Sequence, residues 1–249
     1  MNEGAGLPMM NGPYRANPSI VAGSPSWQPA EGPGILFSSL TLSYGDPVSF
    51  DGLNQLTIVA SIKPTNMTQV TGMVNKRVGA ANQSFSMGWN YSGGSNNLTV
   101  GHGTASSKLT EYNFDTSSWS TTSYQQIAAV LDSQLGSTQK WAVYRNAVKQ
   151  AFVSQSGDTA GTIGDIATNL ELGRVNNGTL YYVGAMNYAY IYNRKLSEAE
   201  IVSLASAPYQ MFAAPVWRRY FVMAAAPPPP PPVTVTDTGD IWRRCYGYF

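Results

Sequence analysis

Few side chains in this chain of 249 residues could carry out nucleophilic or metal-dependent chemistry. The sequence contains one cysteine, Cys245, and one histidine, His102, which excludes an intrachain disulfide, a cysteine-rich zinc site and a buried Cys–His pair. His102 lies between Gly101 and Gly103, and the sequence has no G-x-S-x-G motif that would present a nucleophilic serine. We therefore predict that His102 is an exposed residue of a turn, with no catalytic role.

Paired carboxylates are the second chemistry to consider, because glycoside hydrolysis requires an acid and a nucleophile or base at a fixed separation. The nearest pair is Glu198 and Glu200, in a segment with the pattern of a helix. Helix positions i and i+2 do not face each other, and acidic residues in a first turn are explained by the helix dipole. Glycine motifs that bind phosphates or dinucleotides are also missing from the sequence. We predict no catalytic residues, and hence that the chain is not an enzyme.

Aromatic and amide side chains could instead bind a saccharide. Tryptophan and tyrosine rings stack on sugars, and asparagine can hydrogen-bond the hydroxyl groups. However, Phe85, Met87 and Trp89 alternate with small residues, and a period of two places all three on one face of a strand. That pattern favours a core position for Trp89. The candidate glycan-binding residues are Trp89, Asn90, Tyr91, Asn96, Asn97 and Trp119.

Two similar aromatic–arginine segments near the end of the chain could bind a partner, since Trp, Tyr and Arg dominate the energetics of protein interfaces. The alternative for the first segment is that it ends the domain as a strand. Six prolines, Pro227–Pro232, separate the two segments and predict a stiff polyproline II spacer of about 19 Å, at roughly 3.1 Å per residue. The candidate docking residues are Trp27, Trp217, Arg218, Arg219, Tyr220, Phe221, Trp242, Arg243, Arg244, Tyr246 and Phe249.

The composition favours β-structure and indicates no charged partner. Asp, Glu, Lys and Arg make up only 12% of the residues, about half of the ~25% usual in globular proteins, and the formal net charge is +1. No overall field would therefore attract nucleic acid or an anionic membrane. The N-terminus lacks the pattern of a secretory signal, and no apolar run approaches the ~18 residues of a membrane span. We expect a soluble protein made in a reducing compartment.

Glycine, proline and β-forming residues divide the chain into successive segments. Residues 1–34 are rich in proline and are expected to form an extended arm, or a disordered tail, with little strand pairing. Residues 35–212 are expected to fold as the domain. A closing strand or docking segment is expected at 213–226, the polyproline spacer at 227–232 and a docking peptide at 233–249.

Within the domain, runs of β-formers predict strands and one capped segment predicts a helix. Ser197 can cap this helix, acidic residues occupy its first turn, and Pro208 ends it. An Asn-Asn-Gly sequence at 176–178 predicts a hairpin. The predicted helix covers 198–205, and the predicted strands cover 56–62, 85–91, 124–131, 140–144 and 185–192.

Four stretches of this domain resemble the motifs of a known family. They are Phe50–Pro64, Tyr124–Val130, Val143–Ala147 and Val183–Ile201; the last is similar to the closing motif F-x-G-x-I-D-D-V-R-I-Y-N-R-x-L-S-x-x-E-I almost position for position. Over about residues 36–212 the chain resembles the laminin-G-like, concanavalin A-like jelly-roll family, in its bacterial and bacteriophage branch. The resemblance implies an all-β jelly-roll β-sandwich with one short helix, flanked by the extended N-terminal arm and the proline-rich C-terminal tail.

Departures from the family's motifs bear on metal binding. Asn187-Tyr188 replaces the paired acids of the closing strand, and Gln125-Gln126 replaces a His-His pair. Asn146-Ala147 replaces an N-G turn and fits positive φ less well. Calcium takes about six to eight oxygen ligands, usually including several carboxylates, so the missing acids count against a calcium site. We predict no cofactor, and calcium stays open only through turn residues such as Asp158 and Asp165.

The resemblance, the missing catalytic residues and the two terminal segments together imply a bacteriophage protein. We expect a non-enzymatic virion structural protein with a lectin-like fold, made in the host cytoplasm and acting as a capsid decoration protein. Its expected partners are other virion proteins, such as the major capsid protein or tail and fibre proteins, and further copies of itself, but neither nucleic acid nor a membrane. The alternatives are a tail or head-fibre receptor-binding module that recognises host surface glycans, and a glycoside hydrolase or lyase.

Overall fold

The computed structural model of the chain describes residues 19–27, 34–78, 82–90, 96–104, 109–136, 139–157, 162–175 and 180–210. The chain divides into two units, Met1–Met211 and Phe212–Phe249, and all of the described residues belong to the first. The segments predicted at 213–226, 227–232 and 233–249 therefore lie outside the described residues. Within the described part of the chain, no helix is long and apolar enough to cross a membrane.

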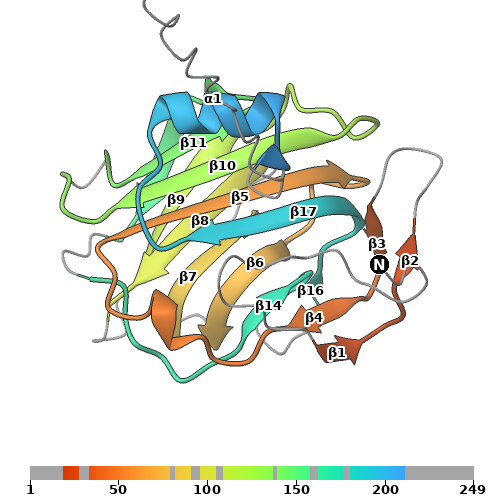
Figure 1. Cartoon of the computed structure of the whole chain (residues 1–249), viewed down its shortest axis with the longest axis horizontal. Coiled ribbons are helices and arrows are strands. Elements are labelled where there is room, and N and C mark those ends of the chain that lie inside the picture. Colours follow the sequence, from red (N-terminus) through yellow and green to blue (C-terminus); the bar gives the residue numbers. More distant parts are fainter. Residues whose placement is uncertain are drawn as a thin grey trace, which may run out of the picture. The chain divides into compact units, whose positions relative to one another are not determined.

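The described part of the first unit consists of two β-sheets that face each other, with one α-helix on an outer face (Figure 1). One sheet has ten strands and the other has seven. A single turn of 3-10 helix, Val48–Phe50, precedes the central strand of the smaller sheet. This architecture confirms the predicted all-β sandwich with one short α-helix.

The ten-stranded sheet includes two short strands, β15 (Arg174–Val175) and β16 (Leu180–Tyr181), that lie off its main path. β16 pairs in parallel with β6. It also pairs antiparallel with β15, and the predicted Asn-Asn-Gly hairpin lies between these two strands in the sequence. The other strands, in spatial order, are β1 (Ser19–Ala22), β4 (Thr41–Ser43), β14 (Leu170–Leu172), β6 (Thr71–Val78), β7 (Asn82–Trp89), β8 (Asn97–Gly103), β9 (Leu109–Asp115) and β13 (Phe152–Ser156).

The seven-stranded sheet contains four of the five strands predicted from the sequence, and the fifth is β7. Their observed ends differ from the predicted ends by at most three residues. In spatial order the strands are β12 (Val148–Lys149), β11 (Trp141–Arg145), β10 (Gln125–Asp132), β5 (Gln55–Pro64), β17 (Gly184–Tyr192), β3 (Ile35–Phe37) and β2 (Ser26–Trp27).

Two short stretches of the expected N-terminal arm, residues 1–34, pair with strands of the domain. β1 pairs with β4 at one edge of the ten-stranded sheet, and β2 pairs with β3 at one edge of the seven-stranded sheet. Ser19, Ile20 and Val21 are exposed, so backbone hydrogen bonds rather than apolar burial hold β1 in place. An edge strand needs only one neighbour, and it can therefore form without the apolar alternation that marks a strand in the sequence.

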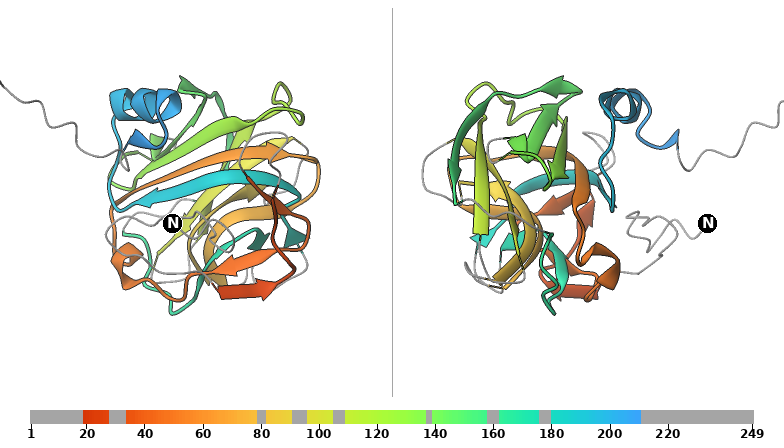
Figure 2. Two further views of the ribbon diagram at one scale, coloured as in Figure 1. Left: turned by 45° about the vertical axis from the view of Figure 1, so that its right-hand side comes forward. Right: turned by 90° about the vertical axis from the view of Figure 1, so that its left-hand side faces the viewer.

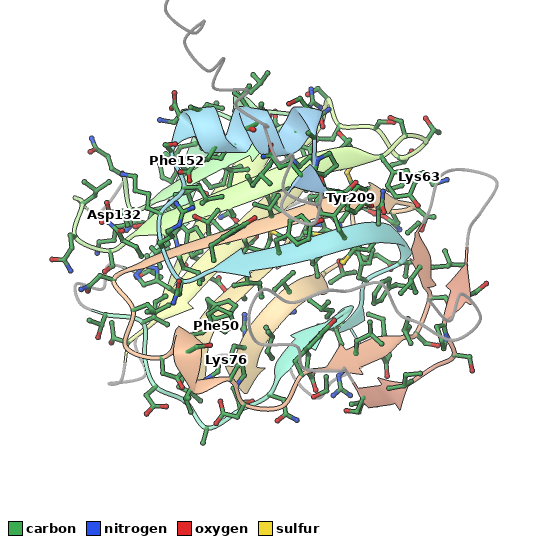
Figure 3. The ribbon with its side chains drawn as sticks, viewed as in Figure 1. Phe50, Lys63, Lys76, Asp132, Phe152 and Tyr209 are labelled. Atoms are coloured by element: carbon green, nitrogen blue, oxygen red, sulfur yellow. The ribbon has the colours of Figure 1, made fainter. Side chains whose placement is uncertain are left out.

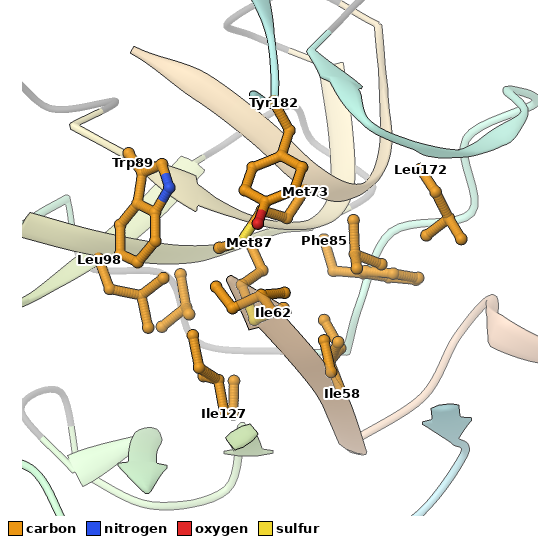
Figure 4. Packing of buried hydrophobic residues seen from close by; sticks show 14 of the residues in the cluster. Ile58, Ile62, Met73, Phe85, Met87, Trp89, Leu98, Ile127, Leu172 and Tyr182 are labelled. Carbon is orange, nitrogen blue, oxygen red and sulfur yellow. The ribbon is translucent and has the colours of Figure 1, made fainter. Parts of the chain in front are cut away.

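The main core lies between the two sheets and is filled from both sides (Figure 4). Phe85, Met87 and Trp89 of β7 are fully buried, as their alternation predicted. Ile58 and Ile62 of β5 enter the same cluster from the opposite sheet. Burial of each side chain of this size contributes about 1.5–3 kcal/mol. This packing fixes the two sheets against each other.

The helix α1 (Glu198–Ser206) covers part of the outer face of the seven-stranded sheet, as Figure 2 shows. The Ser197 Oγ accepts a hydrogen bond from the Glu200 backbone N–H, and the Glu200 carboxylate accepts one from the Ser197 N–H. The predicted helix and its cap are thereby confirmed. Ile201 and Leu204 of α1 are buried in a second cluster that also contains Val59, Ala128, Val130, Tyr144, Tyr188, Tyr190 and Leu196.

His102 is a core residue, so the prediction of an exposed turn histidine is wrong. It lies fully buried in β8, and its Nδ1 accepts a hydrogen bond from Trp141 Nε1 at 3.1 Å. Its ring is stacked near Tyr112, with the two centroids 6.5 Å apart. Because β8 and β11 belong to different sheets, the bond to Trp141 joins the two layers across the core. Gly101 and Gly103, which suggested a turn, pair with β9 instead.

A buried ammonium group holds two loops to the ten-stranded sheet. Lys76 of β6 (Figure 3) has no exposed side-chain surface; its Nζ lies 2.9 Å from Asp46 Oδ1 and forms a second ion pair with Asp51. It also donates a hydrogen bond to the Ile166 carbonyl at 3.0 Å. Burial raises the pKa of the Asp51 carboxyl, Lys76 lowers it, and the charge of Asp165 raises it further. The Lys76 ammonium thus offsets part of the negative charge of this corner.

The hairpin between β11 and β12 contains a strained residue. Asn146 and Ala147 both have positive φ, at 48° and 66°, which asparagine tolerates but the Cβ of alanine disfavours. Asn146 Oδ1 accepts a hydrogen bond from the Gln126 N–H at 2.8 Å, and the Asn146 N–H donates to the Gln126 carbonyl at 2.8 Å. These two bonds hold the turn on β10 despite the alanine. The predicted poor fit of Ala147 to this turn is thus confirmed.

Replacement of Ala147 by glycine should stabilise the protein by about 1 kcal/mol, because glycine adopts positive φ without a Cβ clash. Urea denaturation of the wild type and of Ala147→Gly measures the difference in the free energy of unfolding. Ala151→Gly is the matched control: Ala151 is nearby and exposed but does not have positive φ, so glycine there should bring no gain. A loss of stability in Ala147→Gly would contradict the interpretation that the backbone of Ala147 is strained.

Candidate ligand-binding groove

The tryptophans predicted to stack on a glycan are buried. Trp89 is fully buried and Trp119 is 5% exposed, and their rings meet edge to face with centroids 5.7 Å apart. Trp119 Nε1 also donates a hydrogen bond to Gln150 Oε1 at 3.3 Å. Neither ring offers a face to a sugar, so their assignment as glycan-binding residues is corrected to a core role. For Trp89 this is the alternative that the strand alternation favoured.

The asparagines of the same set shape the connection between β7 and β8. Asn90 is 1% exposed with a φ of 56°; its Nδ2 donates to the Met67 carbonyl at 2.8 Å, and its Oδ1 accepts from the Asn97 N–H at 2.9 Å. Asn96 is half-buried with a φ of 61°, and Asn97 begins β8. The amide of Asn90 is therefore engaged by the backbone, which corrects its assignment as a glycan ligand. Tyr91 lies outside the described residues.

The predicted docking residues fall almost entirely beyond the part of the chain that the structure describes. Trp27 ends β2, and its side chain lies outside the described residues. The docking role of this set stays a prediction. The other members, Trp217, Arg218, Arg219, Tyr220, Phe221, Trp242, Arg243, Arg244, Tyr246 and Phe249, also lie outside the described residues.

A groove of about 580 Å³ opens beside the N-terminal end of α1, and we call it the α1 groove. Four stretches of chain line it: the end of β9, the adjacent parts of β10 and β11 with their connection, the segment from β12 into β13, and the residues that lead into α1. Asp132 and Phe152, which Figure 3 labels, come from two of these stretches. The residues on which its chemistry depends are Asp132, Tyr144, Lys149, Gln150, Phe152, Lys195 and Glu198.

Both carboxylates of the α1 groove already have donors within the protein. Asp132 Oδ2 lies 3.3 Å from Lys195 Nζ and accepts a hydrogen bond from Gln55 Nε2 at 3.4 Å. Glu198 Oε1 accepts a hydrogen bond from the Tyr144 hydroxyl at 2.9 Å. Burial, followed by the bond to Glu198, raises the pKa of Tyr144 to about 12, so the phenol stays protonated near neutral pH. The acids therefore belong to the groove's own bonding pattern.

Phe152 gives the α1 groove an accessible aromatic surface. Its side chain lies in β13 opposite Phe114 of β9, and the residue is 39% exposed. The two rings meet edge to face, with centroids 6.2 Å apart and an angle of 76°. Because Phe114 supports the ring from one side, the position of Phe152 is fixed while part of its surface faces the groove.

The residues that depart from the family's motifs lie near Gln125 and Gln126 at the start of β10, whereas Asp132 ends this strand. Gln126 Nε2 donates a hydrogen bond to the Tyr188 hydroxyl at 3.0 Å, and the Tyr209 hydroxyl donates to Asn187 Oδ1 at 2.6 Å. The Tyr188 ring stacks on Tyr190, with centroids 4.7 Å apart. Of the four replaced positions, Gln126 and Tyr188 thus bond to each other, whereas Asn187 bonds to Tyr209 and Gln125 to the Ser120 carbonyl.

Metal binding finds no support in the described geometry. Among the residues that the structure describes, no group of three or more His, Cys, Asp or Glu side chains could hold a metal ion. Asp165, one of the residues left open as a calcium ligand, acts on the Asp51 carboxylate, and the cation at that place is the Lys76 ammonium. Asp158, the other, lies outside the described residues.

Sequence reasoning missed the α1 groove, because its lining residues are scattered from Phe114 to Glu198 and share no motif. Tyr144 and Glu198 each lie in a family-like motif, but only the fold brings the hydroxyl to the carboxylate. The available signal was Phe152-Val153, an apolar pair within a polar run. That signal is weak, since single exposed apolar residues are common on protein surfaces.

Comparison with known proteins identifies the family. Residues 38–202 match the model of the concanavalin A-like lectin/glucanases superfamily, Laminin_G_3, and the chain belongs to this family. No curated protein matches the chain significantly. The family therefore rests on the domain model together with the fold.

Solved structures with a similar fold include binding domains of toxins. The binding domain of Paraclostridial mosquitocidal protein 1 has a TM-score of 0.57 at 14% identity, covering 79% of this chain and 48% of that chain. The binding domain of botulinum neurotoxin serotype G has a TM-score of 0.56 at 13% identity, covering 78% of this chain and 47% of that chain. This chain thus spans about half the length of those domains. At these identities the likeness establishes the fold.

A third similar structure is domain 4 of AbnA, a GH43 extracellular arabinanase from Geobacillus stearothermophilus, in complex with arabinotriose. Its TM-score is 0.50 at 18% identity, and the match covers 74% of this chain and 82% of that chain. In this case the likeness extends over most of both chains.

The start of α1, which forms one side of the groove, should be sensitive to acid through Glu200. Hydrogen bonds from Arg194 and Ser197 lower the pKa of the exposed Glu200 carboxyl from 4.5 to about 2. A carboxyl with a lowered folded-state pKa stabilises the fold above its unfolded pKa, and this contribution is lost as the pH falls from about 4.5 toward 2. We expect Glu200→Gln to melt below the wild type near neutral pH.

Thermal unfolding followed by circular dichroism, repeated across this pH range, measures the effect. The difference in melting temperature between wild type and Glu200→Gln should shrink as the pH falls, because the wild-type carboxyl then becomes neutral as well. A difference that stays constant across the range would show that Glu200 acts through packing and not through its charge.

Proposed function

We propose that this chain is a non-catalytic, lectin-type binding module that takes a saccharide in the α1 groove. The observation that carries the proposal is the composition of the groove: the accessible ring of Phe152 lies in one hollow with the exposed amide group of Gln139 and with charged side chains. Sugars have apolar ring faces that stack on aromatic rings and hydroxyl groups that need hydrogen-bond partners. The volume of about 580 Å³ lies within the range of roughly 300–1,000 Å³ that is common for small-molecule sites.

The family and the bonding within the groove support binding without turnover. Domain 4 of AbnA was solved in complex with arabinotriose, and the toxin neighbours are binding domains. In the α1 groove, Asp132 is paired with Lys195, and Glu198 accepts the Tyr144 hydroxyl. Glycoside hydrolysis needs one carboxyl free to give a proton and a second free to attack or activate water. The internal donors argue against both roles.

We further propose that this module belongs to a bacteriophage particle, as a capsid decoration protein that docks through its C-terminal segments. The resemblance to the bacteriophage branch, the polyproline spacer at 227–232 and the repeated Trp-Arg-Arg sequence at 217–219 and 242–244 support this setting. A place on a tail or head fibre is the alternative, and it would present the α1 groove to host surface glycans. In either setting the partners are other virion proteins and further copies of the chain.

Saccharide binding should depend on Phe152. We expect the full chain to bind at least one saccharide on a glycan array, and Phe152→Ala to weaken binding about fivefold or more in calorimetry, since a stacked ring contributes on the order of 1 kcal/mol. Val153→Ala is the matched control, because Val153 is the next residue in β13 and is 51% exposed but does not line the groove. No binding at millimolar saccharide, or equal losses in both variants, would contradict the proposal.

Docking to the particle should depend on the C-terminal segments. Deletion of residues 227–249 is expected to abolish incorporation into particles and to leave the domain folded, because no described residue of the sandwich belongs to the deleted part. Mass spectrometry of purified particles measures incorporation, and circular dichroism of the purified variant checks the fold. Normal incorporation of the truncated chain would show that residues 227–249 are not needed for docking.

A further inference from the structure

The α1 groove is lined by both lysines and carboxylates. Its charged lining residues are three lysines, Lys140, Lys149 and Lys195, and two acids, Asp132 and Glu198. The two acids are held by internal donors, as described above, and the groove adds no other carboxylate to them. Lys140 is buried and has a partner of its own, and Lys195 is paired with Asp132, so an anionic ligand in the groove would meet chiefly Lys149.

Lys149 is the ammonium group best placed to meet such a ligand. In the pairing of β12 with β11 it stands directly opposite Tyr144, so both side chains project from the same face of the sheet. Lys149 is exposed, and over the residues that the structure describes its Nζ has neither a hydrogen-bond nor an ion-pair partner. By contrast, Lys195 lies 3.3 Å from Asp132, which already shares its charge. Lys149 can therefore pair with a ligand without first losing a partner.

The remaining lining favours a sugar as the carrier of the negative charge. Phe152 follows Lys149 by three residues and exposes part of its ring to the same groove. The Gln150 amide between them bonds to Trp119 and to the Val148 carbonyl, which fixes it as part of the wall. A ring-stacking surface next to a free ammonium suits a ligand that has both an apolar ring face and a carboxylate. Uronic and sialic acids combine these two features.

We infer that the α1 groove prefers saccharides that carry a carboxylate, and that Lys149 is the residue that determines this preference. The inference rests on the proposed saccharide binding by the same groove. The pair between Lys149 and the ligand would be partly exposed to solvent, so its contribution should be about fivefold in affinity and should weaken with salt.

Matched pairs of ligands test the inference with the full chain. Sialyllactose is compared with lactose, and trigalacturonate with galactotriose; for any other acidic ligand found on an array, the same saccharide is compared before and after chemical reduction of its carboxylates to alcohols. Calorimetry is carried out with the wild type, Lys149→Gln, Lys149→Arg and Lys63→Gln. Lys63 serves as the control because it lies in β5 and does not line the groove.

We expect the acidic member of a pair to bind about fivefold more tightly than its neutral partner, and Lys149→Gln to abolish this difference. Lys149→Arg should retain it, Lys63→Gln should leave it unchanged, and salt should reduce it. A preference for neutral sugars, or an equal loss for both members in Lys149→Gln, would overturn the inference and leave saccharide binding intact. Equal binding of penta-glutamate would assign the groove to acidic peptides instead. If no saccharide binds, the proposed function fails together with the inference.

Discussion

The need to cover the outer face of the seven-stranded sheet shapes the rest of this molecule. Val59, Ala128 and Val130 project from that face, while the inner face of the same strands is already packed against the other sheet. Apolar surface left in water costs about 25 cal/mol per Å², so a face of this kind requires cover. α1 provides it, but a helix of nine residues spans only about 14 Å at roughly 1.5 Å per residue. The α1 groove lies where this cover ends.

A helix cap on one side and a tight turn on the other determine the shape of that groove. The capping box of Ser197 and Glu200 fixes the residue at which α1 begins, and so places Glu198 beside the Tyr144 hydroxyl. On the other side, the turn at Asn146-Ala147 reverses the chain so that β12 presents Lys149 next to the same tyrosine. The chain retains an alanine at positive φ there. The cap at Ser197 and the turn at Asn146-Ala147 thus position opposite sides of the groove, and neither could form the groove alone.

The rare polar side chains of the interior serve the fold. His102 joins the two sheets through Trp141, and Lys76 gathers carboxylates from the loop before β5. A buried charge without partners would cost several kcal/mol, and the Lys76 ammonium has Asp46, Asp51 and the Ile166 carbonyl as partners. His102, Glu198 and Glu200, which sequence reasoning weighs first as catalysts, each have a hydrogen-bond partner within the described fold.

The sequence by itself determined the helix and five of the strands, because alternation in β7, β-forming runs in β5, β10, β11 and β17, and the cap at Ser197 are properties of neighbouring residues. It did not reveal the other strands; β1 and β2, for example, depend on a neighbouring strand for their hydrogen bonds. It also misplaced His102, because glycines in a strand look like a turn. The groove could not be predicted from local patterns. Tyr144, Lys149 and Glu198 come together only when two β-strands and a helix start meet, so tertiary structure alone decided which side chains line the groove.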